Sequence, residues 1–495
     1  MFSKVLVANR GEIACRLIRA LRDMNIESVA VYSDADRGAA HVRLADCAVP
    51  LGPAEAQVSY LHAGKLIDAA RRTGARAILP GYGFLSENSQ FAEACEQAGI
   101  TFVGPRASTI RAMGSKTQAR ALAQAAGVPV VPGGSARSLA EAQTAAAEIG
   151  YPGLLKAAMG GGGKGMRLVT DPRDLAKSLA RARSEAKSAF ASEEVYLEKA
   201  ITGPRHVEIQ VLGDKHGNLI HLYERDCSIQ RRHQKVFEET PSPRLSDSAR
   251  NEMARVALQV ARQVGYDSVG TVEFLVDANE QFYFLEMNTR LQVEHTVTEL
   301  VNNVDLVEQM LRVAAGHELA LRQEDIQPRG FALQCRIYAE DPAHQDLPCA
   351  GTVSHVQLPA GPFVRFDHAL VEHTKVSSYY DPLLGKLCTW GQERTQVLSR
   401  MRRALSELHV GGLTTNAPLL LALLNSPELI AGDYDTSTLE AVRAAWLDSG
   451  HPPPLEAVAA AVAARHLDRS RESAPNRSAS PLSEWARARR PRWRD

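Results

Sequence analysis

Short apolar runs alternate with amphipathic stretches over the first hundred residues of the chain. Runs rich in β-branched residues occupy 4–8, 27–33, 75–80 and 100–104. Between them, segments such as 12–24 and 60–72 repeat apolar residues at helical spacing. This alternation predicts a parallel α/β sheet.

The first strand-to-helix turn of this region is poor in glycine. A dinucleotide site would show G-x-G-x-x-G there, whereas the turn reads ANRGE (8–12) with Gly11 alone. Asp34 and Asp36 follow the second strand, but the missing fingerprint makes an NAD oxidoreductase a disfavoured alternative.

A glycine-rich loop interrupts the next part of the chain. Residues 107–126 predict a helix with Lys116 inside it, and 138–149 predict another. Two strand-like segments, 153–159 and 166–170, then flank GGGGKG, whose backbone N–H groups and lysine can cover a polyphosphate. The loop is not a Walker A motif, so a flexible hinge is the alternative. Lys156, on an otherwise apolar strand, calls for a carboxylate or a phosphate partner.

The strongest pattern lies in 268–294, which predicts a long hairpin after a strand-rich region (195–245) and an amphipathic helix (246–264). If 272–276 pairs with 281–287, Glu273 faces Phe284 and lies diagonal to Glu286. The alternation then continues on one polar face through Glu286, Asn288, Arg290, Gln292 and Glu294. Hard oxygen ligands of this kind predict a Mg²⁺-type site that shares substrate phosphates, and a half-solvated strand is the alternative.

Basic residues concentrate in ERDCSIQRRHQKVFEE (224–239), between the glycine loop and the hairpin. No aromatic platform accompanies them, so single-stranded nucleic acid is a poor fit. They offer cations for a phosphoryl group and a small anion. His206 stands on a strand-like alternation and would, taken alone, be more typical of a core histidine.

Composition narrows the class of protein. The 495 residues predict about three domains by a prior of ~150 residues each, and Lys plus Arg (57) balance Asp plus Glu (57), so nothing global favours nucleic acid or a membrane. Seven scattered cysteines without a C-x-x-C pair argue against disulfides or zinc and favour the cytoplasm. No apolar stretch approaches the ~20 residues of a membrane span, and we expect no secretion signal.

Beyond residue 450 the composition shifts to PPP, an alanine-rich helical stretch (455–466) and a tail of Arg, Ser and Pro. We expect 468–495 to be poorly ordered. Nonspecific attraction of nucleic acid by the basic tail is a disfavoured alternative, because no binding fold accompanies it.

Several motifs occur together and in a fixed order: ANRGEIA (8–14), GYGFLSEN (81–88), GGGGKGMR (160–167), ERDCSIQRRHQK (224–235), EMNTRLQVEH (286–295), RIYAEDP (336–342) and YYDPLLGKL (379–387). In this combination the chain resembles the biotin carboxylase component of biotin-dependent carboxylases, an ATP-grasp family. The motifs GGGGKGMR and YYDPLLGKL resemble acyl-CoA carboxylase α subunits of the methylcrotonyl- or geranyl-CoA type more than the stand-alone acetyl-CoA subunit.

The resemblance implies an α/β protein, α+β overall, in three parts. These would be a Rossmann-like biotin carboxylase N-terminal domain (1–112), an ATP-grasp domain (113–322) with a mobile lid at about 131–203, and a biotin carboxylase C-terminal domain (330–446). Residues 450–495 would add a helix and a basic tail, similar to the start of a domain that links such α subunits to a partner subunit.

The resemblance also implies roles for individual residues. The ATP phosphates would be held by Lys116, Lys156, Gly162, Gly163, His206 and His233, with Gln230 also in the nucleotide site. The adenine pocket would be lined by Glu198, Lys199, Ala200 and Ile201. Mg²⁺ or Mn²⁺ would be carried by Glu273, Glu286 and Asn288. Bicarbonate would be seated by Lys235, Arg290, Gln292 and Val293.

The implied reaction is MgATP-dependent carboxylation of biotin by bicarbonate through carboxyphosphate, the first half-reaction of an acyl-CoA carboxylase. Glu294 would be the general base and Arg336 would stabilise the biotin enolate. Two positions depart from the family pattern, Ala200 after Glu-Lys and Thr296 after Glu-His, and neither threatens the implied activity.

The resemblance implies a biotin carboxyl carrier protein, a carboxyltransferase subunit and a homodimer as partners. Since no methionine is followed by lysine, we expect biotin on a separate carrier or on a portion not present here. Two further alternatives are another ATP-grasp ligase, which the quoted motifs disfavour, and a non-catalytic relative, which the intact site residues disfavour.

Overall fold

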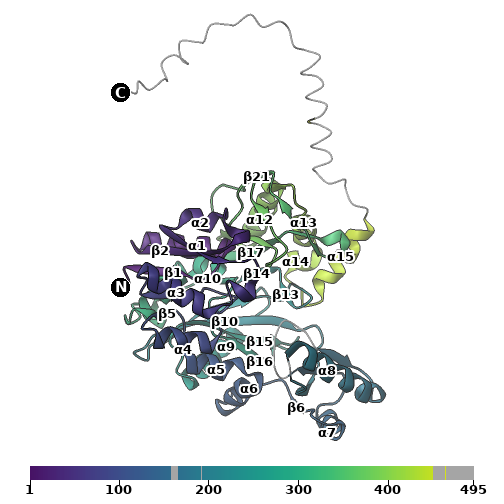
Figure 1. Ribbon diagram of the computed structural model, residues 1–495. Helices are drawn as coiled ribbons and strands as arrows, with labels where there is room; N and C mark the ends of the chain where they lie inside the picture. Colours follow the sequence, from purple (N-terminus) through teal and green to yellow (C-terminus); the bar gives the residue numbers. More distant parts are fainter. Residues whose placement is uncertain (158–165, 191, 450–462, 464–495) are drawn as a thin grey trace, which may run out of the picture. The chain divides into compact units, whose positions relative to one another are not determined.

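The computed structural model describes residues 1–157, 166–190, 192–449 and 463, and residues 1–445 form one compact unit (Figure 1). The unit opens with a five-stranded parallel sheet of order β3-β2-β1-β4-β5. Its strands are β1 (Lys4–Val7), β2 (Glu27–Ser33), β3 (Cys47–Gly52), β4 (Ala77–Leu79) and β5 (Thr101–Phe102). The helices between them are α1 (Gly11–Asp23), α2 (Ala40–Leu44), α3 (Ala63–Thr73) and α4 (Ser89–Gln97). The predicted parallel sheet is confirmed, although the sequence pattern missed β3.

A four-stranded sheet of order β6-β9-β7-β8 contains the two strands that precede and follow the glycine loop in the sequence. Its strands are β6 (Gly133–Ser135), β7 (Gly153–Ala157), β8 (Arg167–Val169) and β9 (Val195–Lys199), with α7 (Leu139–Ile149) and α8 (Leu175–Phe190) beside them. β7 and β8 pair antiparallel, as strand, loop and strand predict. The glycine loop, with Gly162 and Gly163, lies outside the described residues.

An eight-stranded sheet of order β16-β15-β10-β11-β14-β17-β24-β22 runs through the rest of the unit. Its strands, in chain order, are β10 (Arg205–Gly213), β11 (Leu219–Asp226), β14 (Phe237–Thr240), β15 (Val269–Val276), β16 (Phe282–Asn288), β17 (Phe331–Tyr338), β22 (Val364–His368) and β24 (Leu383–Gly391). A small hairpin, β12 (Gln230–Arg231) and β13 (Gln234–Lys235), follows β11. The sheet therefore joins the predicted second and third domains, and their division stays a prediction.

The two faces of the central strands differ in chemistry. Val207, Val272 and Phe274 share a buried cluster with α9 (Asp247–Gln263), which packs on β10 and β11. The alternate residues, among them Glu208 and Glu273, point to the opposite face. Period-two alternation thus makes one face a hydrophobic core and reserves the other for charged groups.

The remaining helices are α5 (Ala107–Gly114), α6 (Lys116–Ala125), α10 (His295–Asn302), α11 (Leu306–Ala314), α12 (Arg394–Glu407), α13 (Ala417–Leu424), α14 (Pro427–Ala431) and α15 (Thr438–Asp448). The predicted single helix over 107–126 is wrong, because Ser115 adopts extended backbone and caps a new helix through its hydroxyl. Lys116 is therefore the first residue of α6. The helix expected at 455–466 lies, except for Ala463, outside the described residues.

The predicted hairpin register is also wrong. Glu273 pairs directly with Glu286 and Phe274 with Phe284, because Leu285 is an extra residue in a β-bulge. β16 ends at Asn288, so the polar alternation beyond it continues in a loop that leads to α10. No helix in the described ranges combines the length and hydropathy that a bilayer span requires.

Replacing a core residue of α9 should destabilise the packing between this helix and the eight-stranded sheet. Met253 is fully buried against the central sheet. We expect Met253→Ala to lower the free energy of unfolding by about 2–5 kcal/mol, since it removes packed atoms and leaves a cavity. Thermal unfolding followed by circular dichroism should show a lower Tm. Asn251→Ala, at an exposed position of the same helix, should leave Tm nearly unchanged, and equal Tm values for both variants would contradict this packing.

Candidate functional site

Four charged side chains lie in a row across neighbouring strands of the central sheet. Arg225 on β11 is the cross-strand partner of Glu208 on β10, which is opposite Glu273 on β15, which is opposite Glu286 on β16. Like charges in direct cross-strand positions repel each other. Three acids in a row therefore require cations on the same face.

Lys235, at the end of the β12–β13 hairpin, supplies the central cation. Its Nζ lies 2.5 Å from a Glu208 oxygen and 2.8 Å from oxygens of both Glu273 and Glu294. Burial by itself would lower the pKa of Lys235, but the three carboxylates raise it well above its ordinary value. The lysine is therefore a fixed ammonium shared by acids from three different elements.

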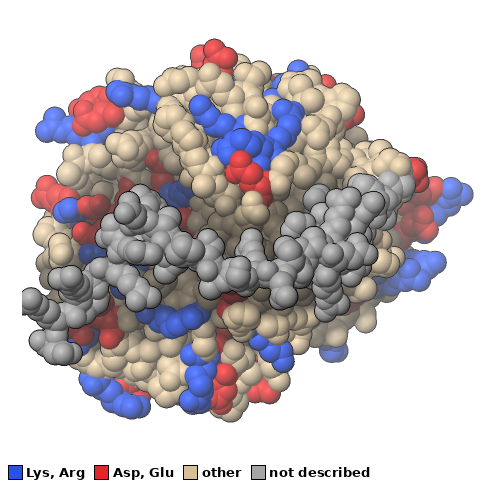
Figure 2. Space-filling model, turned by 90° about the horizontal axis from the view of Figure 1, so that it is seen from above, with Lys and Arg blue, Asp and Glu red and all other residues tan. Residues whose placement is uncertain are grey.

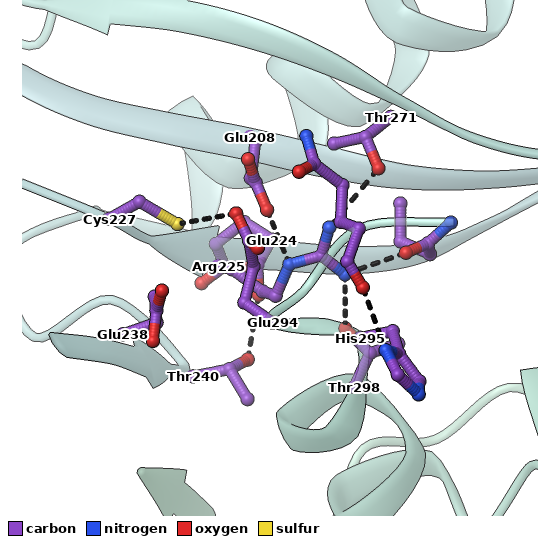
Figure 3. A network of polar contacts seen from close by, with 12 residues as sticks. Glu208, Glu224, Arg225, Cys227, Glu238, Thr240, Thr271, Glu294, His295 and Thr298 are labelled. Atoms are coloured by element: carbon purple, nitrogen blue, oxygen red, sulfur yellow. Dashed lines mark hydrogen bonds and ion pairs between the residues drawn. The ribbon is translucent and has the colours of Figure 1, made fainter. Parts of the chain in front are cut away.

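Arg225 lies at one end of the row and has no exposed surface. Figure 3 shows its guanidinium beside the Glu208 carboxylate. Its Nε donates to Glu208 at 2.5 Å, and its Nη atoms donate to Gln210, Thr271 and Thr298. Burial raises the pKa of Glu208 above its ordinary value, against the opposing charges of Arg225 and Lys235. This carboxylate depends on both cations to remain ionised.

Glu294 lies between two cations at the start of α10. Its Oε1 is 2.8 Å from Lys235 Nζ and its Oε2 is 2.9 Å from an Arg336 Nη2. Burial alone would raise the pKa of Glu294, but Lys235 and Arg336 hold it below its ordinary value. Figure 3 also shows the Cys227 thiol turned toward it, with Sγ 3.9 Å from Oε1. The site therefore presents an ionised, fully buried carboxylate.

Glu273 and Glu286 form the acidic end of the row. Asn288 and Gln292 donate to Glu273 Oε1 at 2.9 Å, and His206 Nε2 lies 2.9 Å from its Oε2. Burial and the charge of Glu273 raise the pKa of Glu286, whose carboxylate is 3.8 Å from Lys116 Nζ. Facing carboxylates that resist joint ionisation, beside a carboxamide, fit the donor set of a divalent cation.

Arg290 extends from the loop after β16. Its Nε donates to Glu87 at 2.8 Å, and its Nη atoms lie 3.2 Å from oxygens of Asn288 and Gln292. Val293, beside Gln292, is half-buried. Glu87 belongs to GYGFLSEN, and it brings the first parallel-sheet region into contact with the loop. The loop is thus tied to two parts of the chain before any substrate binds.

A second group of predicted residues gathers on the four-stranded sheet. Lys156 on β7 lies 2.6 Å from Glu198 on β9, and Arg120 on α6 donates to the same carboxylate at 2.8 Å. Lys156 therefore has the carboxylate that its buried position requires. Lys199 and Ala200 follow with backbone bonds to Pro132 and Pro152, and Ile201 comes next at half-buried depth.

Two histidines and a glutamine connect these groups. Gln230 Nε2 lies 3.0 Å from His206 Nδ1, so β12 reaches the acidic row. His233, in the turn of the β12–β13 hairpin, has its pKa lowered by burial and by the charge of Lys156. The charge of Lys156 therefore acts on His233, which links the hairpin to the four-stranded sheet electrostatically.

The structure brings most of the predicted residues together and adds some that the sequence pattern missed. The missed residues with direct contacts in the site include Glu87, Arg120, Glu208, Arg225 and Glu238. Glu208 could have been found, because it alternates with His206 and Gln210 along β10. Arg225 and Glu87 gave no such signal, since their partners are distant in the chain.

Comparisons with known proteins agree along the chain. Three family models match: Biotin carboxylase, N-terminal domain (1–110), Carbamoyl-phosphate synthase L chain, ATP binding domain (115–322), and Biotin carboxylase C-terminal domain (334–441). Biotin carboxylase 1 of Bacillus subtilis is 48% identical over 443 residues, which are 89% of this chain and 98% of that protein.

Longer relatives and solved structures match as well. The propionyl-CoA carboxylase alpha chain of Ruegeria pomeroyi is 47% identical, with 94% of this chain and 72% of that protein covered. The chain spans 60% of the methylcrotonoyl-CoA carboxylase subunit alpha of Arabidopsis thaliana. The biotin carboxylase domain dimer of Hydrogenobacter thermophilus 2-oxoglutarate carboxylase, solved with MgADP and bicarbonate, superposes with a TM-score of 0.86 at 44% identity, covering 90% of this chain and 99% of that one.

Removing the buried guanidinium should destabilise the chain more strongly at higher pH. Arg225→Met leaves Glu208 with less compensation, and breaking a buried pair costs about 3–5 kcal/mol. Because burial already raises the pKa of Glu208 in the folded wild type, the charge-dependent part of the cost is absent while Glu208 is protonated in both proteins. It grows as pH rises above that raised pKa. The Tm deficit should therefore be larger at about pH 7.5 than at about pH 5.

Arg255→Met is the matched control, since Arg255 is an exposed arginine of α9 paired with Glu252. Its Tm should stay close to that of the wild type at both pH values. A deficit in Arg225→Met that is equal at the two pH values would contradict the electrostatic account.

Proposed function

The chain belongs to the biotin carboxylase family of ATP-dependent ligases, and from this premise we propose that it carboxylates biotin with bicarbonate at the expense of ATP. One observation carries the assignment: the ionised carboxylate of Glu294 is held between Lys235 and Arg336, next to an acidic row suited to a divalent cation. A base, an anion site and a metal site would thus lie together, at the start of α10 and on the charged face of the eight-stranded sheet.

Bicarbonate would bind beside Glu294, with Lys235, Arg290, Gln292 and the Val293 backbone as its seat. Glu294 would take the bicarbonate proton, and the resulting oxyanion would attack the γ-phosphoryl group of ATP to form carboxyphosphate and ADP. The two cations on Glu294 favour its ionised form before the reaction. Because the site is buried, it also limits the access of water to carboxyphosphate.

The nucleotide would lie between the four-stranded sheet and the acidic row. Lys116, Lys156, His206, Gln230 and His233 would hold its phosphates, and the residues at the end of β9, Glu198 to Ile201, would line the adenine pocket. Glu273, Glu286 and Asn288 would hold Mg²⁺ or Mn²⁺, which would neutralise charge on the transferring phosphoryl group. Lys156 would then exchange its contact with Glu198 for a phosphate.

Arg336 would act on the second substrate. When carboxyphosphate breaks down to CO₂ and phosphate, the phosphate would remove the proton from the ureido nitrogen of biotin. That nitrogen would then attack the carbon of CO₂ to form N-carboxybiotin. Negative charge develops on the ureido oxygen in this step, and the Arg336 guanidinium is the fixed cation that would stabilise it. Its pKa is raised well above the ordinary value, because two carboxylates outweigh the effect of burial.

The whole assembly would extend beyond this chain. We propose that biotin is presented on a biotin carboxyl carrier protein and that a carboxyltransferase subunit completes an acyl-CoA carboxylase. The sequence motifs favour an enzyme of the methylcrotonyl- or geranyl-CoA type. A homodimer of this chain is supported by the Hydrogenobacter thermophilus relative, which was solved as a dimer. The seven free cysteines support action in the cytoplasm.

Release of ADP by the purified chain tests this function. With MgATP and bicarbonate, free biotin should raise the rate of ADP release, and omission of bicarbonate should abolish it. Chelation of divalent metal should also stop turnover. ADP release that ignores bicarbonate would contradict the proposal and would favour a different ATP-grasp ligase.

Substitution of the base or of the anion seat should remove the activity without unfolding the chain. We expect Glu294→Gln and Arg290→Ala to lower bicarbonate-dependent ADP release by at least about 100-fold, the lower range of general-base effects. Glu252→Gln, at an exposed position of α9, serves as the control and should retain the wild-type rate. Wild-type activity in either site variant would refute its role.

A further inference from the structure

Arg336 is held by more than its contact with Glu294. Its Nε donates to Glu238 Oε1 at 2.5 Å, while its Nη2 donates to Glu294 at 2.9 Å. Glu238 lies on β14 and has no exposed surface. It is not among the residues to which the sequence motifs gave a role. The guanidinium is therefore fixed along one edge by two carboxylates from different elements.

Glu238 is itself held in place. Gln334 is its direct cross-strand partner on β17, and the amide nitrogen of Gln334 donates to Glu238 Oε2 at 2.9 Å. Both oxygens of Glu238 thus accept hydrogen bonds, one from Arg336 and one from Gln334. The carboxylate cannot rotate without breaking one of them.

The chain of bonds returns to its starting point through Thr296. The hydroxyl of Thr296 donates to the amide oxygen of Gln334, and Thr296 stands two residues after Glu294 on α10. Thr296, Gln334, Glu238 and Glu294 are all fully buried. Glu294, Arg336, Glu238, Gln334 and Thr296 therefore form a closed ring that joins α10 to β14 and β17.

We propose that Glu238 is a positioning residue for the biotin half of the reaction, and that the ring through Gln334 and Thr296 sets the direction of the Arg336 guanidinium. The inference rests on the proposed function. Glu238 touches no reacting atom; it acts only through Arg336. Glu294 keeps its second oxygen on Lys235, so the ATP and bicarbonate steps do not depend on the ring in the same way.

Two substitutions separate charge from geometry in the ring. Glu238→Gln keeps the shape of the side chain, and a flipped Gln334 amide can still bridge it to the Thr296 hydroxyl, which donates or accepts. It therefore removes mainly the charge that faces Arg336. Thr296→Val keeps the volume and removes the hydroxyl bond to the Gln334 amide oxygen, which leaves that oxygen only its long contact with Cys388 Sγ at 3.7 Å. It acts three bonds away from Arg336.

The test measures ADP release with saturating MgATP and bicarbonate over a range of biotin concentrations. We expect Glu238→Gln to lower kcat/KM for biotin by about tenfold or more, in the range that misplacement of a catalytic group produces, and Thr296→Val to lower it by a smaller factor. The slow bicarbonate-dependent release without biotin should stay within about twofold of the wild type, since Lys235 still holds Glu294.

Thr240→Val is the matched control. Thr240 lies on the same strand as Glu238, is buried, and donates its hydroxyl to the Glu224 backbone outside the ring. Thr240→Val should leave both rates unchanged. A loss of activity in Thr296→Val could then not be explained by the removal of a buried threonine hydroxyl alone.

Two outcomes would overturn the inference alone. One is a wild-type kcat/KM for biotin in Glu238→Gln, and the other is an equal loss of the biotin-dependent and biotin-independent rates, which would show a general structural role. If the wild-type chain itself releases ADP at the same rate with and without biotin, the proposed function fails and the inference fails with it.

Discussion

The site depends on one ammonium group that three buried carboxylates share. Lys235 faces Glu208, Glu273 and Glu294, which come from β10, β15 and the start of α10. Each acid would be expensive to bury alone, and the strands place Glu208 and Glu273 directly opposite each other. The lysine makes this arrangement possible, and the arrangement in turn fixes the lysine. The positions of Glu294 and of the acidic row are thus set by a single electrostatic requirement.

The two faces of the central sheet have different roles: one packs in the hydrophobic core, and the other carries the charged groups of the site. The apolar residues of β10 and β15 pack with α9, while their neighbours at period two carry the charged row. On the face of the molecule that Figure 2 shows, basic and acidic side chains are interspersed. The charges of Arg225, Glu208 and Glu273 in the row are buried, and they lie where neighbouring strands of the sheet present opposite charges at close range.

The sequence predicted the elements better than it predicted their register. The parallel sheet, α9 and the convergence of Glu273 and Glu286 followed from periodicity. The direct pairing of these two acids did not, because the bulge at Leu285 leaves no local signature. Arg225 and Glu238 were missed for another reason: each is one charge in a basic or acidic run, and only contacts with residues distant in the chain, such as Thr271 and Arg336, distinguish it.

The eight-stranded sheet has a consequence for how such proteins can recombine. Two family models divide this chain between 322 and 334, yet β14 on one side of that division pairs with β17 on the other, Glu238 opposite Gln334. If the segment on one side of residues 322–334 were replaced by that of a relative, the new segment would have to pair in the same register. It would also have to supply matching buried polar side chains. We therefore expect recombination to transfer the two segments together, because they share one sheet, even though two separate family models match them.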